Sequence, residues 1–214
     1  MKYFLLFFNL IVIHFPLNAQ SNDITKPFNE FTNLFHDKST PLNLDRKTIF
    51  GLATYNTKEY KEISSIYQGY LLSELLKDST NCKFRCIINL KYSSELILLL
   101  IAKDIYENGD QIELELYLDL YKQDGEIIDY KYISGFKIDT KEKFAEIEKD
   151  LKVTTKEYQF SISKEQKHPD LYYAQETIEN WAVTITGLFV KTREIITNGY
   201  FNGDWGGYKL IYKE

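Results

Sequence analysis

The side chains that most often carry catalysis are few in this chain and widely separated. After His14, which lies in an apolar N-terminal run, the only histidines are His36 and His168, about 130 positions apart. Neither has a second residue at the spacing of a zinc site or a His-based triad. No serine is framed by the glycines of a nucleophile elbow, and no phosphate-binding or dinucleotide-binding loop occurs. The sequence therefore predicts no catalytic residue, no metal site and no cofactor.

Carboxylates are abundant enough for acid–base chemistry. The chain has 31 Asp and Glu residues, and two of them facing one pocket would suffice for a glycosidase-type reaction. The sequence singles out no pair by a hydrophobic setting. A carboxylate-dependent hydrolase acting on envelope or environmental polymers is therefore the alternative to a non-enzymatic binding protein. A pocket with two convergent carboxylates, one with a raised pKa, would favour the hydrolase.

Cys82 and Cys86 are the only cysteines. Export to an oxidising compartment would permit a disulfide between them. On one extended strand, however, their Cα atoms would lie about 13 Å apart, whereas a disulfide needs roughly 4.4 to 6.8 Å. Bridging them would require a turn at Lys83 and Phe84. The strand pairing given below instead buries Cys86 against Ile101 as a small hydrophobic residue.

The most suggestive cluster of side chains lies near the C-terminus. Residues 198–208 hold four of the ten glycines and four aromatic rings. Rings exposed on a glycine-rich loop can stack on sugars or anchor a protein partner. We predict that this loop binds a glycan or an envelope protein through Tyr200, Phe201, Trp205 and Tyr208. In the alternative interpretation it is a long hairpin tip whose rings fold back onto the sheet edge.

Asn202 and Asp204 in the same segment offer oxygen ligands for calcium. Two such residues do not make a calcium site.

Residues 1–19 have the pattern of a secretory signal peptide. Lys2 precedes an apolar run over residues 3–15, and Ala19 precedes four polar residues. The run is shorter than the roughly 20 residues of a membrane span, and no cysteine follows Ala19 to carry a lipid. We expect cleavage near Ala19 and a single periplasmic or secreted domain over residues 20–214, without a transmembrane span. An uncleaved membrane anchor is the alternative.

The composition after the leader is that of one packed globular domain. Hydrophobic residues make up 44% of the chain and aromatic residues 15%, with 17 Tyr and 14 Phe. Together with the many β-branched residues, this excludes a disordered tail and favours sheet. The 26 basic and 31 acidic residues give a net charge of −5, which becomes −6 without Lys2. A mildly acidic chain with no basic stripe does not fit nucleic-acid binding.

A four-stranded antiparallel meander is predicted over residues 84–91, 95–106, 111–122 and 127–137. Apolar and polar side chains alternate strictly over residues 111–121, as in a strand with one buried face. Asn108 and Gly109 predict a two-residue type I′ turn, which pairs Glu107 with Asp110.

For the turn at residues 123–125 we predict a three-residue loop with Gly125 in the left-handed conformation. A two-residue loop would place Leu120 opposite Asp129 and is rejected for that reason.

These turns predict the neighbours across the strands: Leu99 faces Leu118, Ile101 faces Leu116, Leu120 faces Ile128 and Asp119 faces Asp129. A turn at Ser93 and Ser94 places Cys86 opposite Ile101. One buried face should then hold Leu99, Ile101, Leu114, Leu116 and Leu118. Because residues 96–100 are apolar at every position, that end of the sheet should be covered on both faces.

Helices near residues 27–36 and 60–76 are predicted to provide this cover. In the first, Phe28, Phe31 and Phe35 recur at helical spacing after Pro27. We expect a short strand over residues 47–55, a short helix over 141–149, and strands over 152–163, 181–185, 188–196 and 209–212. The predicted fold class is α+β, an antiparallel meander sheet with N-terminal helices packed on it. A nearly all-β sandwich or barrel is the alternative.

The leader, the aromatic spacing of Phe28, Phe31 and Phe35 before Pro41, and the hairpin around residues 123–126 resemble small uncharacterised secreted proteins of Gram-negative bacteria. The resemblance extends to a late aromatic strand and implies an envelope location. It implies no activity and no functional residues. We therefore expect an exported non-enzymatic binding or interaction protein of the cell envelope or extracellular space.

Overall fold

The structure is a computed structural model that describes residues 27–54, 59–76, 81–91, 95–161 and 167–214. The predicted signal peptide, its cleavage site and the turn at Ser93 and Ser94 lie outside these residues.

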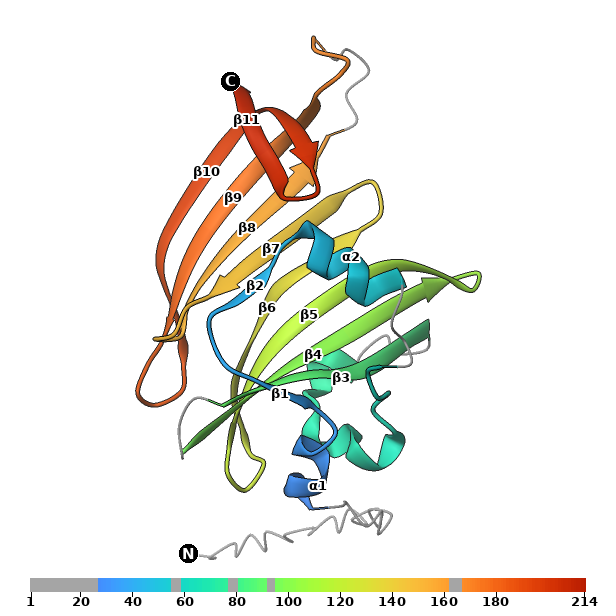
Figure 1. Cartoon of the computed structure of the whole chain (residues 1–214), viewed down its shortest axis with the longest axis vertical. Coiled ribbons are helices and arrows are strands. Elements are labelled where there is room, and N and C mark those ends of the chain that lie inside the picture. The colour runs from blue at the N-terminus through green and yellow to red at the C-terminus, as the bar shows by residue number, and fades with distance from the viewer. Residues whose placement is uncertain (1–26, 55–58, 77–80, 92–94, 162–166) are drawn as a thin grey trace, which may run out of the picture.

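A single open sheet of eleven strands dominates the fold (Figure 1). Neighbouring strands are antiparallel, except that β1 and β3 are parallel. The predicted antiparallel sheet is confirmed, but the fold is mainly β with few and short helices, so the α+β class gave the helices too much weight. The strands in spatial order are β1 (His36–Lys38), β3 (Cys82–Lys91), β4 (Leu96–Glu107), β5 (Asp110–Lys122), β6 (Ile127–Lys137), β7 (Lys141–Ile147), β8 (Lys152–Phe160), β9 (Tyr172–Val183), β10 (Phe189–Asp204) and β11 (Gly207–Lys213).

The remaining strand, β2 (Leu42–Leu44), fills a gap in this order. β6 pairs with β7 only at their joined ends, from Gly135 to Lys137, and β2 pairs with the rest of β7. Gly135 has a φ of 146°, and a β carbon there would lie 2.0 Å from the carbonyl oxygen of Leu114. Only glycine fits that backbone. β6 is therefore the neighbour of β7 only near their connecting turn, and β2 is its neighbour over Ala145–Ile147.

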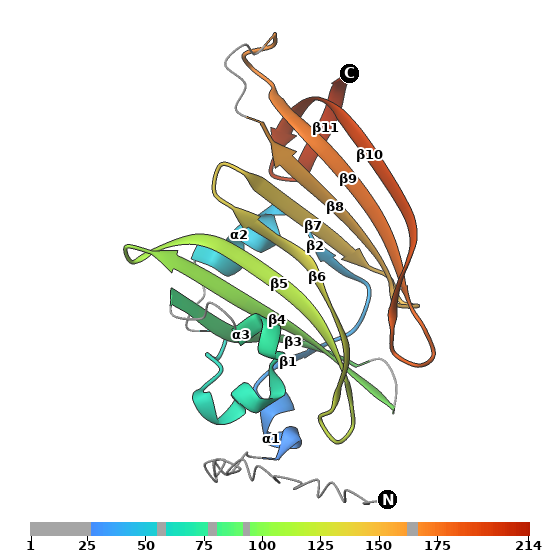
Figure 2. The ribbon, with the colours of Figure 1, turned by 180° about the vertical axis from the view of Figure 1, so that it is seen from behind.

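Short helices cover the two faces of the sheet. α2 (Arg46–Thr54) packs on one face, which we call the α2 face. The other, the α3 face, carries α1 (Phe28–Thr32), the 3-10 helix η1 (Ser65–Tyr70) and α3 (Ser73–Leu76). Figures 1 and 2, seen from opposite sides, show α2 and α3 on opposite faces. None of the described helices is long and apolar enough to cross a membrane.

Four predictions of secondary structure need correction. The helix predicted over residues 60–76 is divided into η1 and α3, because the backbone of Leu71 is extended. Residues 47–54 belong to α2 and not to a strand, because Asp45 caps the helix by accepting the Thr48 amide at 2.8 Å, and residue 55 lies outside the described residues. Most of the helix predicted over residues 141–149 is instead the strand β7 (Lys141–Ile147), since these residues pair with three other strands. The first predicted helix ends early, at Thr32, before β1.

Both faces of residues 96–100 are covered, as predicted, with Leu96 and Ile97 half-buried and residues 98–100 fully buried. On the α2 face Leu98 and Leu100 join the larger core, with Ile49 and Leu52 of α2. On the α3 face Leu99 packs in a second core, which is rich in aromatic rings. The rings and aliphatic residues contributed there by the N-terminal segments are Phe28, Phe31, Phe35, Ile63, Tyr67, Leu71 and Leu75.

Both predicted hairpin turns form, but β-bulges shift the registers beyond them. Asn108 and Gly109 have positive φ, and Glu107 pairs with Asp110. A bulge at Ile105 and Tyr106 then places Leu118 opposite Leu100 and not Leu99, and Leu116 opposite Ala102 and not Ile101.

The second predicted turn also forms, and a bulge again shifts the register next to it. Gly125 is left-handed, with a φ of 93°. A bulge between Leu120 and Tyr121 nevertheless produces the rejected pairing of Leu120 with Asp129, so that Asp119 faces Tyr130 and not Asp129.

These bulges divide the predicted buried set between the two faces, because one extra residue reverses the side-chain alternation. All five residues are fully buried. Leu114, Leu116 and Leu118 lie in the core on the α2 face, whereas Leu99 and Ile101 lie in the core on the α3 face. The prediction of a single face is therefore wrong.

The pairing of Cys86 with Ile101 is confirmed. Cys86 is fully buried, and burial raises the pKa of its thiol to about 12. Cys82 lies on the same extended strand, β3, where four residues span roughly 13 Å.

Candidate binding site

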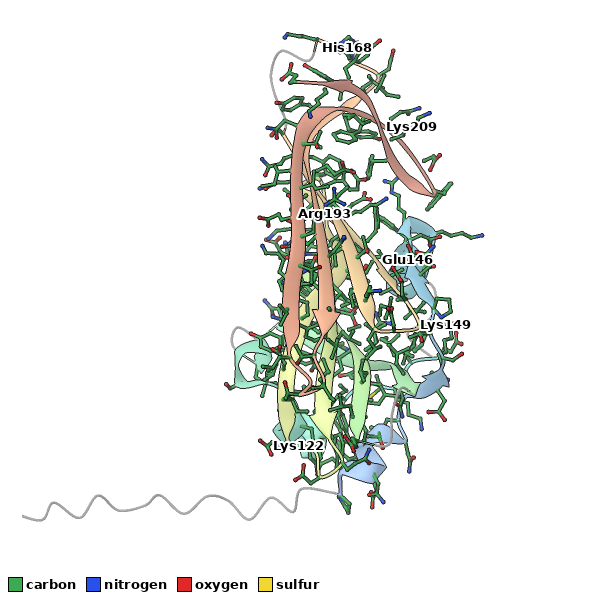
Figure 3. All side chains as sticks on the ribbon, turned by 90° about the vertical axis from the view of Figure 1, so that its left-hand side faces the viewer. Lys122, Glu146, Lys149, His168, Arg193 and Lys209 are labelled. Atoms are coloured by element: carbon green, nitrogen blue, oxygen red, sulfur yellow. The ribbon has the colours of Figure 1, made fainter. Side chains whose placement is uncertain are left out.

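The glycine-rich segment is a β-hairpin and not a loop. β10 and β11 extend through residues 198–208 and are joined by a tight turn at Trp205 and Gly206. The Asp204 carboxylate accepts the Gly206 amide at 2.7 Å in that turn. Figure 3 shows β10 bending over at its end, so that β11, labelled at Lys209, lies on the same side of the sheet as α2.

The hairpin separates the four rings predicted to bind. Phe201 is fully buried, edge-on to Tyr158 at 5.5 Å, and Tyr200 is buried against Tyr173. These two rings have no free face for a ligand. Trp205 is 67% exposed, and Tyr208 is half-buried. The predicted site is therefore reduced to Trp205 and Tyr208.

Tyr208 borders a pocket of about 460 Å³ on the α2 face. This volume is in the range of small-molecule sites. The lining comes from α2, the β6–β7 turn and the strands β6, β7, β8, β9 and β11. It consists of Arg46, Phe50, Phe136, Lys137, Ile138, Asp139, Glu142, Phe160, Ser161, Tyr172, Tyr173 and Tyr208.

Aromatic rings form most of the wall of this Tyr208 pocket. Phe50 of α2 stacks on Phe136 of β6, with centroids 4.8 Å apart and planes 7° apart. Tyr208 contacts Phe160 at 5.2 Å and the edge of Tyr172 at 5.6 Å. Trp205 lies edge-on to Phe50 at 6.5 Å, which places this exposed ring beside the wall. The pocket therefore offers apolar ring surfaces.

Three polar side chains converge within the wall. Arg46 and Glu142 form a two-pronged ion pair, with Nε 3.0 Å from Oε2 and Nη2 donating to Oε1 at 3.0 Å. The Tyr208 hydroxyl also donates to Oε1, at 3.0 Å. The Arg46 guanidinium lies over the rings of Phe50 and Tyr208, 5.5 and 5.3 Å from their centroids. We call Arg46, Glu142 and Tyr208 the polar triad.

Protonation in the triad follows from these contacts. Burial tends to lower the pKa of Arg46, but its hydrogen bond to Glu142 and the charge of Glu142 raise that pKa above its ordinary value. Burial and the Glu142 charge raise the pKa of the Tyr208 hydroxyl. At neutral pH Arg46 is therefore a cation and Tyr208 a neutral donor.

The backbone holds the triad in place from two directions. Arg46 Nη1 donates to the carbonyl of Asp204 at 3.3 Å and so links α2 to the β10–β11 turn. The Tyr208 ring lies against the backbone of Gly203, where a β carbon would come within 2.6 Å of Tyr208 Cε1. A side chain at position 203 would displace the ring.

Tyr208 also lines a second, smaller pocket of about 230 Å³. Its wall is more polar than that of the Tyr208 pocket and includes Asn43, Asp45, Glu146, Thr154 and Lys156.

The carboxylate with a raised pKa lies elsewhere. Asp119 is fully buried, and desolvation raises its pKa to about 7. It neighbours Tyr121 in the core on the α3 face, at 3.3 Å, and it does not line the Tyr208 pocket. Among the residues that the structure describes, no group of three or more His, Cys, Asp or Glu side chains could hold a metal ion.

Sequence reasoning found one member of the triad and missed two. Tyr208 was predicted from the density of rings and glycines in residues 198–208. Arg46 and Glu142 lie 96 positions apart and meet only because β2 and α2 fold against β7. The local sequence around Arg46 and around Glu142 does not indicate a pocket.

No family model, curated protein or solved structure matches this chain.

Proposed function

We propose that the chain is an exported, non-enzymatic binding protein of the cell envelope or extracellular space, and that its ligand occupies the Tyr208 pocket. The observation that carries the proposal is the lining of this pocket, in which aromatic walls surround a few convergent polar groups. That composition is typical of small-molecule sites.

The shape of the site favours a small ligand over a protein surface. Phe50, Phe136, Phe160 and Tyr172 line a concavity, and concave, mostly apolar sites are typical of small ligands. Of the four rings predicted from sequence, only Trp205 is exposed by more than a third.

The environment of Glu142 favours binding over hydrolysis. A catalytic acid or base must exchange protons with its substrate. Glu142 is instead engaged by the Arg46 guanidinium and the Tyr208 hydroxyl. Its Oε1 atom already accepts hydrogen bonds from both groups, and such charge-assisted contacts suit a positioning role.

The test is a binding screen of the chain from residue 20 onward against soluble glycans and envelope proteins. Tyr208→Ala should weaken binding roughly 10- to 100-fold, because removing a ring that packs on the ligand loses about 1.5 to 3 kcal/mol. Trp205→Ala should weaken it less, since Trp205 lies beside the wall. Tyr212→Ala is the matched control: it removes an exposed ring of β11 that stacks on His168 and does not line the pocket.

Equal binding by all these variants would reject the Tyr208 pocket as the binding site.

Export is tested by a separate measurement. Mass spectrometry of protein recovered from cells should show a chain that begins near Gln20, and a full-length chain retained in the inner membrane would contradict export.

A further inference from the structure

We infer that the Tyr208 pocket binds an organic cation through an N-alkylated ammonium group, which packs on inclined aromatic rings beside the carboxylate of Asp139. This inference rests on the proposed function and specifies the class of its ligand.

The first step is the geometry of the rings. Phe160, Tyr172 and Tyr208 line the pocket together and contact one another, with ring centroids 5.2 to 5.8 Å apart. Their planes are inclined to one another by 56°, 58° and 83°. Rings at such angles form a corner and not a flat platform, so a compact rounded group contacts more of them than a planar group does. N-alkylated ammonium groups have this shape, and aromatic cages bind them by cation–π attraction.

The second step concerns the cation that the pocket already holds on its rings. The Arg46 guanidinium lies 5.5 and 5.3 Å from the ring centroids of Phe50 and Tyr208. Among the described side chains, no cation lies over Phe160 or Tyr172. Tyr172 is also 49% exposed. Phe160 and Tyr172 are therefore available to a cationic ligand.

The third step is the charge of the lining, which contains two cations, Arg46 and Lys137, and two anions, Asp139 and Glu142. Glu142 lies 3.0 Å from Arg46, and Lys137 lies 3.2 Å from Glu113, which is outside the lining. Asp139 has no ion pair or side-chain hydrogen bond with any residue in the described part of the chain. The pairing thus leaves one negative charge in the pocket, which favours a cationic ligand over an anionic one.

The backbone places Asp139 beside the rings. Asp139 is exposed in the β6–β7 turn and has a φ of 59°. The Thr140 amide closes this turn by donating to the Lys137 carbonyl at 3.1 Å, and the Thr140 carbonyl accepts the Phe160 amide at 2.9 Å. The residue after Asp139 is thus bonded directly to Phe160, so the carboxylate lies at the rim of the pocket next to this ring.

Hydration distinguishes among the cations that could enter. A metal ion or a primary ammonium group is strongly hydrated, and losing that water in a pocket walled by rings is costly. An N-alkylated ammonium group carries its charge beneath methyl or methylene groups, so it loses less hydration and packs on the rings. The net charge of the chain, −5, adds a long-range attraction for such a cation.

The experiment compares choline with 3,3-dimethyl-1-butanol, in which carbon replaces the charged nitrogen and the shape is kept. Calorimetry is done on the chain from residue 20 onward. We expect choline to bind at least about tenfold more tightly, a difference of about 1.4 kcal/mol. Equal binding of the two compounds, or binding of neither, would overturn the inference.

A third probe identifies the source of the ammonium group. Dihexanoylphosphatidylcholine is added below its micelle concentration. Tighter binding of this lipid than of choline would support the inference with a lipid headgroup as the ligand, and weaker binding would support it with a free small molecule.

Asp139→Asn tests the carboxylate. Asn keeps the size of the side chain and tolerates the left-handed backbone. We expect choline to bind about three- to fivefold more weakly, as for the loss of an exposed ion pair, while binding of the neutral compound stays unchanged. Asp110→Asn is the control, because it removes an exposed carboxylate of the β4–β5 turn outside the pocket lining. Choline binding that is the same in both variants would overturn the inference.

Tyr172→Leu tests the rings. It keeps an apolar side chain but removes the aromatic face, so choline should bind about 3- to 30-fold more weakly. Binding of the neutral compound should change little, whereas a merely structural role of Tyr172 would weaken both ligands equally and contradict the inference. Tyr212→Leu is the control, since Tyr212 is equally exposed and outside the lining. Thermal unfolding establishes that each variant is folded.

The outcomes also separate this inference from the proposed function. If a glycan or an envelope protein binds in a way that depends on Tyr208 and choline does not bind, the inference is overturned and the proposed function stands. If choline, glycans and envelope proteins all fail to bind, both are overturned.

Discussion

β4 and β10 belong to the two halves of one sheet and differ in how far they are covered. In β4, residues 98–102 are fully buried, because the α2 face and the α3 face are both covered there. In β10, residues 191–198 are mostly exposed, and Ile196 is 55% exposed. Figures 1 and 2 show no helix over the middle of β9 and β10 on either face. We therefore expect side chains in the covered half of the sheet to contribute most of the free energy of unfolding.

The ion pairs of the two halves differ in the same way. Arg85 of β3 donates to Asp104 of β4 through Nε and Nη2, at 2.5 and 2.7 Å, and to the Leu52 carbonyl of α2 at 3.0 Å, all out of solvent. Lys191 of β10 pairs with Glu194 at 2.8 Å, where both side chains are about 40% exposed. Hydrogen bonds satisfy the buried pair, while water competes for the exposed one.

The largest expected effect comes from breaking the buried pair. Arg85→Met leaves Asp104 as an uncompensated buried charge, and we expect the free energy of unfolding to fall by about 3 to 5 kcal/mol. Lys191→Met should change it by less than about 1 kcal/mol. Urea unfolding of both variants measures the difference, and similar effects at the two positions would contradict the comparison.

A matched pair of apolar truncations comes next. Leu100→Ala opens a cavity in the core on the α2 face and should reduce the free energy of unfolding by about 2 to 5 kcal/mol. Ile196→Ala, on exposed β10, should change it by no more than about 0.5 kcal/mol. A large effect of Ile196→Ala would show that another element covers β10.

The core on the α3 face should carry a pH dependence that the exposed half lacks. The Tyr121 hydroxyl lies 2.9 Å from the Tyr70 carbonyl and 3.3 Å from Asp119 Oδ2, and it can donate its proton to either oxygen. Desolvation of the fully buried Asp119 raises its pKa to about 7, although the contact with Tyr121 acts in the opposite direction.

The direction of the pH dependence follows from the different pKa of Asp119 in the folded and the unfolded chain. From pH 3.8, the ordinary Asp value, to about pH 7, the folded chain keeps a proton that the unfolded chain releases, so stability falls as pH rises and levels off above pH 7. The total is on the order of 4 kcal/mol at about 1.4 kcal/mol per pKa unit. Asp119→Asn should abolish this slope and be more stable than the natural chain above pH 7. An unchanged slope would exclude Asp119 as its source.

The smallest effect is expected at the β9–β10 turn. Ile185 is 96% exposed, and Ile185→Ser should change the free energy of unfolding by less than about 0.5 kcal/mol. Binding at the Tyr208 pocket should also be unaffected, because Ile185 is not in its lining. If Ile185→Ser lowered the stability or the binding, Ile185 would have to contact a second molecule.

The parts of the fold that could be predicted from the sequence are those set by local backbone chemistry. Asn108, Gly109 and Gly125 have positive φ, as their residue types indicated, and both hairpins turn where expected. The bulges next to Tyr106 and Leu120 could not be predicted. They are decided by which side chains find cover on each face. Residues 96–102 of β4 are apolar at every position, so either register buries apolar side chains there.

The same limit applies to the site. Trp205 and Tyr208 stand out because rings and glycines are dense in one short segment. Arg46 and Glu142 carry no such local pattern, and the ion pair that joins them depends on a contact between distant segments. Residues 47–55 were even predicted as a strand, so the helix that supplies Arg46 and Phe50 was not anticipated.

The position of β2 has a consequence for the order in which the protein folds. Leu42 pairs with Ile147, so β2 cannot dock until a strand made about 100 residues later has formed. Contacts between such distant segments are slow to form because a long loop must first be closed. Arg46 follows β2 directly, and the pocket is therefore completed in the last step. In refolding experiments we expect ligand binding to appear with the slowest phase, so that an occupied pocket marks a chain that has finished folding.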